Sequence, residues 1–324
     1  MIFKNAFHLL IDNFALNYKY LLYKLIVVAI SVGLAAAFVV PNAAFLFSSE
    51  PFGDVIGLIK DFFKALVSGD TVFLNGFSES LKTALSDLGS YIAAKTSNWV
   101  LLAVAAAAVI LIYRFLSGLG NFVFGGLVDD KMSSYAKTSF SGAFIRNLGR
   151  ASLWQLIYVP VTFVYDALML VLCYLFFLTL LNVISFTLLA SALALMLSVT
   201  LLLVAQAVKL SVFNGVVPAF VSDKLKLSAA LKKGFSHLKG RFGALFSTYL
   251  ATSLIILCMY MVAGVFTFGA GLLLAVPVSY LMLICIQFVS YYMFEGKKYF
   301  IAKDKIIQPE KDKKEEDFYD DFDL

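Results

Sequence analysis

Long apolar runs dominate the pattern of hydrophobic and polar positions along the chain. Six runs are nearly free of charged residues and are long enough to cross a hydrocarbon core of about 30 Å. They cover residues 22–47, 99–119, 153–181, 183–208, 243–268 and 271–294. Continuous runs predict helices, because a membrane β-barrel shows segments of about ten residues with alternating polarity. The sequence therefore predicts an all-α polytopic membrane protein with six transmembrane helices.

Composition supports this class. Of the 324 residues, 61% are hydrophobic and only 15% are charged, whereas soluble domains carry about a quarter charged residues. The third and fourth runs meet at Asn182, and the fifth and sixth meet at Gly269 and Ala270. These two pairs are therefore predicted to form tight helical hairpins.

An amphipathic stretch precedes the first, third and fifth runs. The segments Phe7-x-x-Leu10-x-x-x-Phe14 and Phe235-x-x-Leu238-x-x-x-Phe242 share one spacing. The full apolar faces are Phe3, Phe7, Leu10, Ile11 and Phe14; Phe140, Phe144 and Leu148; and Leu231, Phe235, Leu238 and Phe242. The pattern favours a unit of one interfacial helix and one transmembrane hairpin, used three times, over a chance match of a few apolar positions.

The loop of residues 48–98 carries two further apolar stripes separated by a turn-like segment at 68–70. The stripes are Phe52, Val55, Ile56, Ile59, Phe62, Phe63 and Leu66, then Phe77, Leu81, Leu85, Leu88, Tyr91 and Ile92. They predict an extracytoplasmic pair of amphipathic helices between the first two spans. The pair could lie on the outer leaflet or cap the bundle; alternatively, it could act as a lid or dock a protein partner.

Basic residues predict the orientation of the chain. All but four of the 26 Lys and Arg residues lie outside the loop of residues 48–98. The positive-inside rule then places both termini in the cytoplasm. We expect a six-span membrane domain over residues 1–300 and a disordered acidic cytoplasmic tail over 301–324, which could also dock a partner.

The loop before the fifth run combines a proline with a basic amphipathic segment. Pro218 is expected to end or kink the preceding helix, and Ser222 or Asp223 to cap the next one. The basic residues of this loop are Lys224, Lys226, Lys232, Lys233, Lys239 and Arg241. Such a segment is expected to bind anionic lipid headgroups at about 1 kcal/mol per basic side chain. The alternative is that these residues only fix the topology.

The same loop carries a family resemblance. Pro218, a short polar turn and the helix Ser228–Gly234 resemble bacterial six-span membrane families related to the membrane domain of glycerophosphodiester phosphodiesterases. The resemblance implies a six-span fold in a bacterial cytoplasmic membrane. In those phosphodiesterases catalysis belongs to a separate soluble barrel domain, and these residues hold no counterpart of it. The resemblance therefore implies a fold and no activity.

Asp166 is the only acidic residue inside a predicted span, and an ionisable group at membrane depth is expensive unless it is paired or hydrated. It is therefore the first candidate for a proton or cation relay or a substrate contact; the alternative is a packed structural carboxyl. No basic partner is predicted at midplane depth. Gln287 and Tyr260 could donate hydrogen bonds to it, and Lys209 only if the third span starts at Pro160. Gln206, Gln287 and Asn182 are expected to join helices by hydrogen bonds.

Other residues offer little chemistry. Gly118, Gly120, Gly125 and Gly126 lack the Gly-Lys-Ser/Thr of a phosphate loop and predict a flexible exit from the second span. His8 and His237 have no metal-ligand spacing and are predicted to be exposed. The cysteines, Cys173, Cys258 and Cys285, fall inside spans and are predicted to be packing residues without disulfides.

These patterns lead to two hypotheses of function. The first is a non-enzymatic membrane protein that engages lipids or a partner protein, without a cofactor, a metal or a nucleic-acid partner. The second is a transporter of small solutes or lipids with Asp166 in a central cavity.

Overall fold

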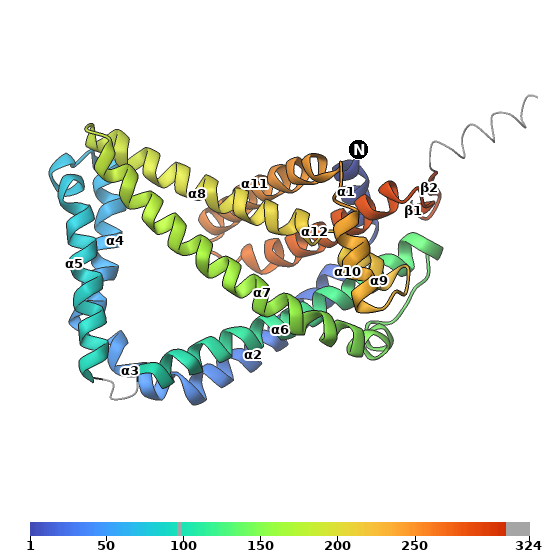
Figure 1. Cartoon of the computed structure of the whole chain (residues 1–324), viewed down its shortest axis with the longest axis horizontal. Helices are drawn as coiled ribbons and strands as arrows, with labels where there is room; N and C mark the ends of the chain where they lie inside the picture. The colour runs from blue at the N-terminus through green and yellow to red at the C-terminus, as the bar shows by residue number, and fades with distance from the viewer. Residues whose placement is uncertain (96–98, 309–324) are drawn as a thin grey trace, which may run out of the picture. The chain divides into compact units, whose positions relative to one another are not determined.

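The computed structural model describes residues 1–95 and 99–308, apart from the side chain of Asn42 (Figure 1). The helices are α1 (Ile2–Asp12), α2 (Ala15–Phe38), α3 (Val40–Phe47), α4 (Glu50–Ser68), α5 (Thr71–Lys95), α6 (Trp99–Ser134), α7 (Phe140–Val183), α8 (Thr187–Val212), α9 (Val216–Val221), α10 (Leu227–Ser236), α11 (Phe242–Phe266) and α12 (Leu272–Phe294). Two antiparallel strands follow, β1 (Tyr299–Ala302) and β2 (Lys305–Ile307).

Six of these helical segments are long and apolar enough to cross a membrane, which confirms the all-α polytopic class. They are α2, α6, α7, α8 together with α9, α11 and α12. Short connections join α7 to α8 and α11 to α12, as predicted. In the second turn Gly269 has a φ of 87°, and its N–H donates to the carbonyl of Gly264. A glycine adopts this left-handed conformation without steric cost, so α11 can end there and reverse into α12.

The chain divides into two compact units. The first unit holds residues 1–27, 115–159 and the described residues from 206 onward, and the second holds 28–114 and 160–205. In the first unit α12 carries the core, and α1 packs against α12 and β1. Tyr20, Tyr249, Tyr291, Phe124 and Phe288 are among its largest fully buried side chains.

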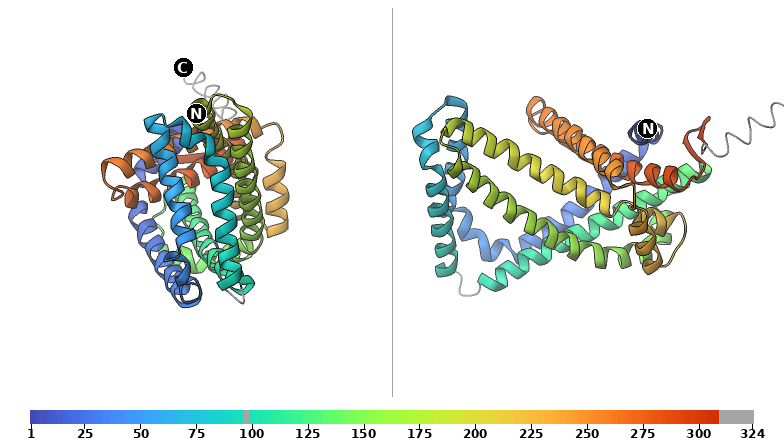
Figure 2. Two further views of the ribbon diagram at one scale, coloured as in Figure 1. Left: turned by 90° about the vertical axis from the view of Figure 1, so that its left-hand side faces the viewer. Right: turned by 45° about the horizontal axis from the view of Figure 1, so that its top comes forward.

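The second unit holds the α4–α5 pair, which confirms the amphipathic helices predicted in the loop (Figure 2). Gly69 is left-handed, with a φ of 74°, and makes the turn between them. Phe62 and Phe77 meet at a ring-centroid distance of 4.4 Å, and Phe177 of α7 lies 5.9 Å from Phe62. Thr187, the first residue of α8, donates a hydrogen bond to Asn75. The turn end of the pair therefore packs on the turn end of the α7–α8 hairpin.

Two predicted boundaries were wrong. The first span was expected over 22–47, but α2 ends at Phe38 and α3 begins at Val40, with Pro41 in its first turn. Proline removes a backbone donor and clashes with the preceding turn, so it favours a new helix start there. The second interfacial helix is not separate, because α7 runs without a break from Phe140 through Pro160. Among the described residues, only α1 and α10 are separate short helices before a span.

The glycine-rich stretch of α6 is helical and buried rather than a flexible exit. A Cβ on Gly118 would overlap Gln155 of α7, and one on Gly120 would overlap Tyr23 of α2. A Cβ on Gly125 would lie 2.8 Å from the Phe288 ring, and one on Gly126 would lie 2.9 Å from Asn147 Nδ2. Close helix contact therefore outweighs the low helix propensity of glycine, as is common between membrane helices.

A strand pair occupies the start of the segment predicted to be the tail. Tyr299 pairs with Ile307 and Phe300 pairs with Ile306, so residues 301–307 are part of an ordered strand pair. Tyr299 is buried, and Asn5 of α1 donates a hydrogen bond to its hydroxyl at 2.9 Å. The prediction of disorder was therefore wrong for residues 301–307. The acidic segment 309–324, predicted to be disordered or to dock a partner, lies outside the described residues.

Candidate functional site

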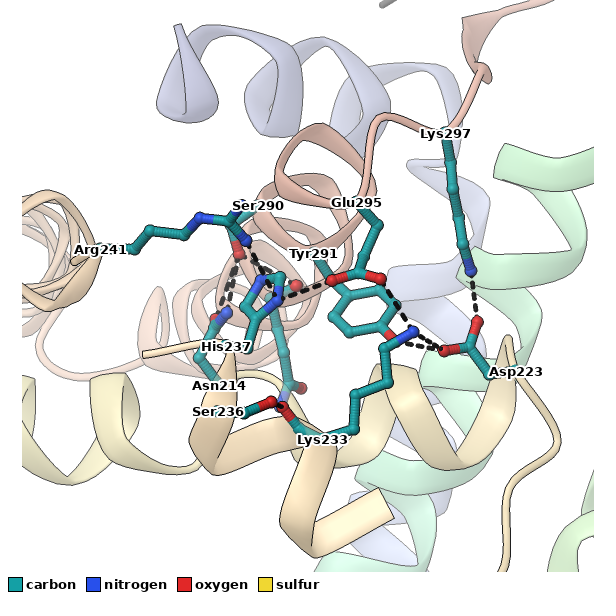
Figure 3. A network of polar contacts seen from close by, with 11 residues as sticks. Asn214, Asp223, Lys233, Ser236, His237, Arg241, Ser290, Tyr291, Glu295 and Lys297 are labelled. Carbon is teal, nitrogen blue, oxygen red and sulfur yellow. Dashed lines mark hydrogen bonds and ion pairs between the residues drawn. The ribbon is translucent and has the colours of Figure 1, made fainter. Parts of the chain in front are cut away.

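A network of charged side chains joins the end of α12 to the α9–α10 segment (Figure 3). Asp223, just after α9, accepts hydrogen bonds from Lys233 (2.6 Å), Lys297 (2.5 Å) and the hydroxyl of Tyr291. Glu295, just after α12, accepts from Lys233 (2.8 Å) and from His237 Nδ1 (3.0 Å). Lys233 therefore bridges two carboxylates that lie on different segments of the chain.

The network fixes the charges of its members. Burial alone raises the pKa of Asp223, but the hydrogen bonds from Lys233, Lys297 and Tyr291 outweigh it and hold the pKa below its ordinary value. For Glu295, Lys233 and His237 likewise outweigh burial and lower the pKa. Burial lowers the pKa of Lys233, but its two carboxylate partners raise it above the ordinary value. Both acids and Lys233 are therefore charged near neutral pH.

His237 is buried, so the prediction of an exposed histidine was wrong; His8 is exposed as predicted. Burial lowers the pKa of His237, and the opposing effect of Glu295 does not restore it. Because Glu295 is ionised, Nδ1 of the neutral ring must donate to it. Within the described residues Nε2 has no hydrogen-bond partner. The sequence did not reveal this position because α10 ends at Ser236 and turns the next residue inward against the end of α12.

Neither predicted helix cap is used. The residue before α10 is Lys226, and no side chain caps this helix. Ser222 instead donates to Asp129 of α6, which also accepts from Tyr292 Oη at 2.7 Å. These bonds tie the segment before α10 to α6 and α12. The α9–α10 segment is therefore held by side chains of α6 and α12 rather than by its own cap.

A second polar cluster holds the segment from the other side. The Tyr249 hydroxyl donates to Asn214 Oδ1 at 2.5 Å, and Asn214 Nδ2 donates to Ser290 Oγ at 3.0 Å. A Cβ on Gly234 of α10 would lie 2.6 Å from a methyl group of Val216 and 2.9 Å from its backbone. This contact brings α10 directly against the start of α9.

The six predicted lipid-facing basic residues separate into two groups. Lys233 belongs to the network, and the Arg241 guanidinium lies 5.0 Å from the centroid of the Phe294 ring. Lys224, Lys226, Lys232 and Lys239 are exposed. On α10 the exposed side chains of Ser228, Ala229, Lys232, Phe235 and Ser236 lie on one face, opposite the buried Ala230 and Gly234. The exposed face thus combines a cation with an aromatic ring.

Asp166 has a basic partner that the sequence did not predict. Arg114 Nη1 donates to Asp166 Oδ2 at 2.8 Å, and the guanidinium lies 5.5 Å from the Phe163 ring centroid. The sequence analysis counted Arg114 only among the basic residues outside the loop of residues 48–98. The structure places it on α6 opposite Asp166 of α7, and both residues belong to the second unit.

The other intramembrane candidates lie elsewhere. Gln287 donates a long hydrogen bond of 3.4 Å to the Phe213 carbonyl, which joins α12 to the end of α8 as predicted. Gln206 and Lys209 are half-buried on α8. These residues belong to the first unit, whereas Asp166 belongs to the second.

Lys24 is a buried cation, which the sequence analysis used only as one of the basic residues that predict the orientation of the chain. It lies within α2, and its Nζ donates to Ser117 of α6. The same atom lies 4.5 Å from the ring centroid of Tyr280 and 5.2 Å from that of Tyr20. The faces of aromatic rings attract a cation where water is excluded, so two tyrosines hold this amine. The tyrosine on α12 is distant in sequence, which explains why no local signal revealed the site.

Within residues 1–95 and 99–308, no group of three or more His, Cys, Asp or Glu side chains is placed to hold a metal ion. Cys173, Cys258 and Cys285 are free thiols. No protein-family model, curated protein sequence or solved structure matches this chain.

Proposed function

We propose that this protein is a non-enzymatic module of a bacterial cytoplasmic membrane that engages anionic lipids at its cytoplasmic face, with both termini on that side. One observation carries the proposal. The exposed lysines Lys224, Lys226, Lys232 and Lys239 share the segment of residues 224–242 with the exposed rings of Phe235 and Phe242. Phe242 is the first residue of α11, an apolar helix of membrane-spanning length, so this basic aromatic surface lies where that helix would enter the bilayer.

The charged network supports the positive sign of this surface. Asp223 and Glu295 are occupied by Lys233, Lys297 and His237. None of the four exposed lysines forms an ion pair with a carboxylate among the described residues, and none of them is needed for the network. A surface of this kind attracts anionic headgroups, and salt weakens the attraction.

Helix α1 supports the proposal independently. One face, with Ile2, Ala6 and Leu9, is buried, while Phe3, Phe7, Ile11 and Phe14 are exposed. The next helix, α2, starts three residues after α1 ends. An exposed aromatic face directly before a spanning helix is typical of an interfacial helix.

The transport hypothesis receives less support. It required a membrane-embedded acid available to a substrate or a proton, and Asp166 forms an ion pair with Arg114. The packing of the α4–α5 turn on the α7–α8 turn favours a cap over a mobile lid. The six-span layout also fits the proposed kinship with the membrane domain of glycerophosphodiester phosphodiesterases.

Lipid selectivity tests the proposal. Native mass spectrometry of the full chain in mild detergent would compare binding of phosphatidylglycerol with binding of phosphatidylcholine. Replacing Lys224, Lys226, Lys232 and Lys239 with glutamine should lower the preference for phosphatidylglycerol by more than about tenfold. The control replaces the four lysines of the α4–α5 pair, Lys60, Lys64, Lys82 and Lys95, with glutamine and should keep the preference. Equal preferences in both variants would contradict the proposal.

A further inference from the structure

The Arg114–Asp166 pair lies at membrane depth on two helices of the second unit. Residues 99–113 of α6 and 167–183 of α7 contain no charged side chain. At the rise of an α-helix the pair is about 22 Å along α6 from its start and about 25 Å along α7 from its end. Between this ion pair and the α4–α5 helices, both α6 and α7 are therefore uncharged.

The pair is not sealed inside the protein. The Arg114 side chain is 32% exposed and that of Asp166 is 25% exposed. A guanidinium has five N–H donors, and Arg114 uses one, from Nη1 to Asp166 Oδ2. Its other donors have no hydrogen-bond partner among the described residues, and its Cζ lies 5.5 Å from the Phe163 ring centroid. Unsatisfied donors are costly in hydrocarbon, so donors at membrane depth call for an external acceptor.

The side chains next to the pair are apolar and accessible. Ile110, one turn before Arg114 on α6, is 46% exposed, and Leu170, one turn after Asp166 on α7, is 61% exposed. Beyond the pair, the parts of α6 and α7 that belong to the second unit diverge toward the α4–α5 pair in Figure 1 and in the right-hand view of Figure 2. Leu101 and Val104 of α6 and Leu168 and Val171 of α7 are also exposed, so apolar side chains are accessible on several sides of both helices beyond the pair. An acyl chain can lie along such a surface.

We propose that Arg114 binds the phosphate group of a membrane phospholipid whose acyl chains lie along α6 and α7. The planar fork of a guanidinium matches two phosphate oxygens, and the nearby Phe163 ring adds a cation–π contact. Asp166 positions Arg114 by accepting the hydrogen bond from Nη1 and also competes with the lipid for the cation. This site is separate from the exposed lysines of the α10 segment.

A zwitterionic probe isolates the site, because phosphatidylcholine carries a phosphate but no net charge for the basic surface to attract. Native mass spectrometry would measure the affinity of the delipidated full chain for phosphatidylcholine. The affinity should fall about tenfold in Arg114→Gln, because this variant loses a charge-assisted hydrogen bond to the phosphate. The matched control is Arg146→Gln, because Arg146 also forms one ion pair at 2.8 Å, with Asp130, on an exposed surface. It should bind phosphatidylcholine as the wild type does.

A second variant separates lipid binding from a purely structural role. Asp166→Asn removes the competing carboxylate and should bind phosphatidylcholine at least as well as the wild type. If Arg114→Gln and Asp166→Asn lose binding equally, the pair only holds the helices and the proposal is wrong; unchanged binding in Arg114→Gln overturns it too. Displacement of the lipid by millimolar inorganic phosphate would assign the site to free phosphate and overturn the proposal that it binds a phospholipid. Replacing the four exposed lysines of the α10 segment should leave this binding unchanged, so failure of one proposal is distinguishable from failure of the other.

Discussion

His237 lies buried against Glu295, with its Nδ1 3.0 Å from the carboxylate oxygen Oε1. The ring also faces Tyr291 and Phe294, at centroid distances of 5.0 Å and 5.4 Å. The contact joins the C-terminal end of α10 to the C-terminal end of α12, which are separated by the whole α11–α12 hairpin in sequence. It therefore couples the protonation of one side chain to the position of the α10 segment.

This contact predicts how stability depends on pH. Burial lowers the folded pKa of His237, against the smaller effect of Glu295 and with Arg241 and Lys233 nearby. The unfolded chain therefore binds the proton more readily, and stability is full above the unfolded value of about 6.5 and falls as the pH drops below it. We expect a slope of at most about 1.4 kcal/mol per pH unit.

Thermal unfolding in detergent between pH 7.5 and pH 5 would measure this slope. His237→Gln should remove the loss of stability near pH 6, whereas His8→Gln, at an exposed position, should keep it. The carboxylates have lowered pKa values and should lose their contribution only in more acidic buffer. A wild-type protein that is equally stable across this range would contradict the prediction.

Replacing Asp223 should leave two cations of the network without one of their charged acceptors. In Asp223→Asn, Lys233 and Lys297 lose a charged acceptor in a largely buried setting, so we expect a destabilisation of about 2 kcal/mol. The control is Glu79→Gln, which breaks the exposed i,i+3 pair with Lys82 and should change stability by less than about 0.5 kcal/mol. Unfolding temperatures of the two variants would compare them, and equal shifts would show that the network adds no stability.

The glycines of α6 predict an asymmetric response to alanine. In Gly125→Ala the new methyl group would press on the Phe288 ring in the core, and we expect a loss of about 1–3 kcal/mol. Gly149 of α7 has open space around its missing Cβ, so Gly149→Ala should be stabilising by about 0.5–1 kcal/mol through helix propensity. A stabilising Gly125→Ala would refute the close packing of α6 and α12.

Two neighbouring phenylalanines test the docking of the α4–α5 pair. Phe62 is buried against Phe77 and Phe177, whereas Phe63 is 48% exposed. Phe62→Ala should cost about 3–5 kcal/mol locally and speed proteolysis within residues 48–95. Phe63→Ala should leave the cleavage rate unchanged. Equal cleavage in the two variants would mean that the pair is not anchored on α7 and α8.

Sequence patterns predicted the spans well because few backbone structures other than the helix are possible in lipid. A run such as 243–268 must satisfy its backbone internally, so its length and apolar character suffice to predict the α11 helix. The α4–α5 pair followed from periodicity in the same way. The structure of the glycine-rich stretch of α6 could not be predicted in this way, because a flexible loop and a tightly packed helix can have the same glycine-rich composition. Only the tertiary neighbours Tyr23, Gln155 and Phe288 distinguish the two.

The polar contacts lay beyond sequence reasoning for a different reason. Glu295 and Asp166 have partners, His237 and Arg114, that are distant in sequence, and each pairing depends on where a helix ends or continues. The spacing of residues along the chain does not show which of these distant side chains meet. Lys233 and Arg241 looked like Lys232 and Lys239 in the sequence, and only tertiary structure separated the half-buried pair from the exposed pair.

The most direct test of the central claim is the position of α10 relative to the bilayer. A spin label at Phe235→Cys, in a background with Cys173, Cys258 and Cys285 replaced by serine, would be measured in nanodiscs by collision with oxygen and with a water-soluble nickel complex. A label at Lys137→Cys, in the exposed segment between α6 and α7, serves as the control. The account predicts that anionic lipid raises oxygen collisions and lowers nickel collisions at residue 235 but not at residue 137. Equal collisions at residue 235 in anionic and neutral nanodiscs would contradict the claim that this surface engages anionic lipid.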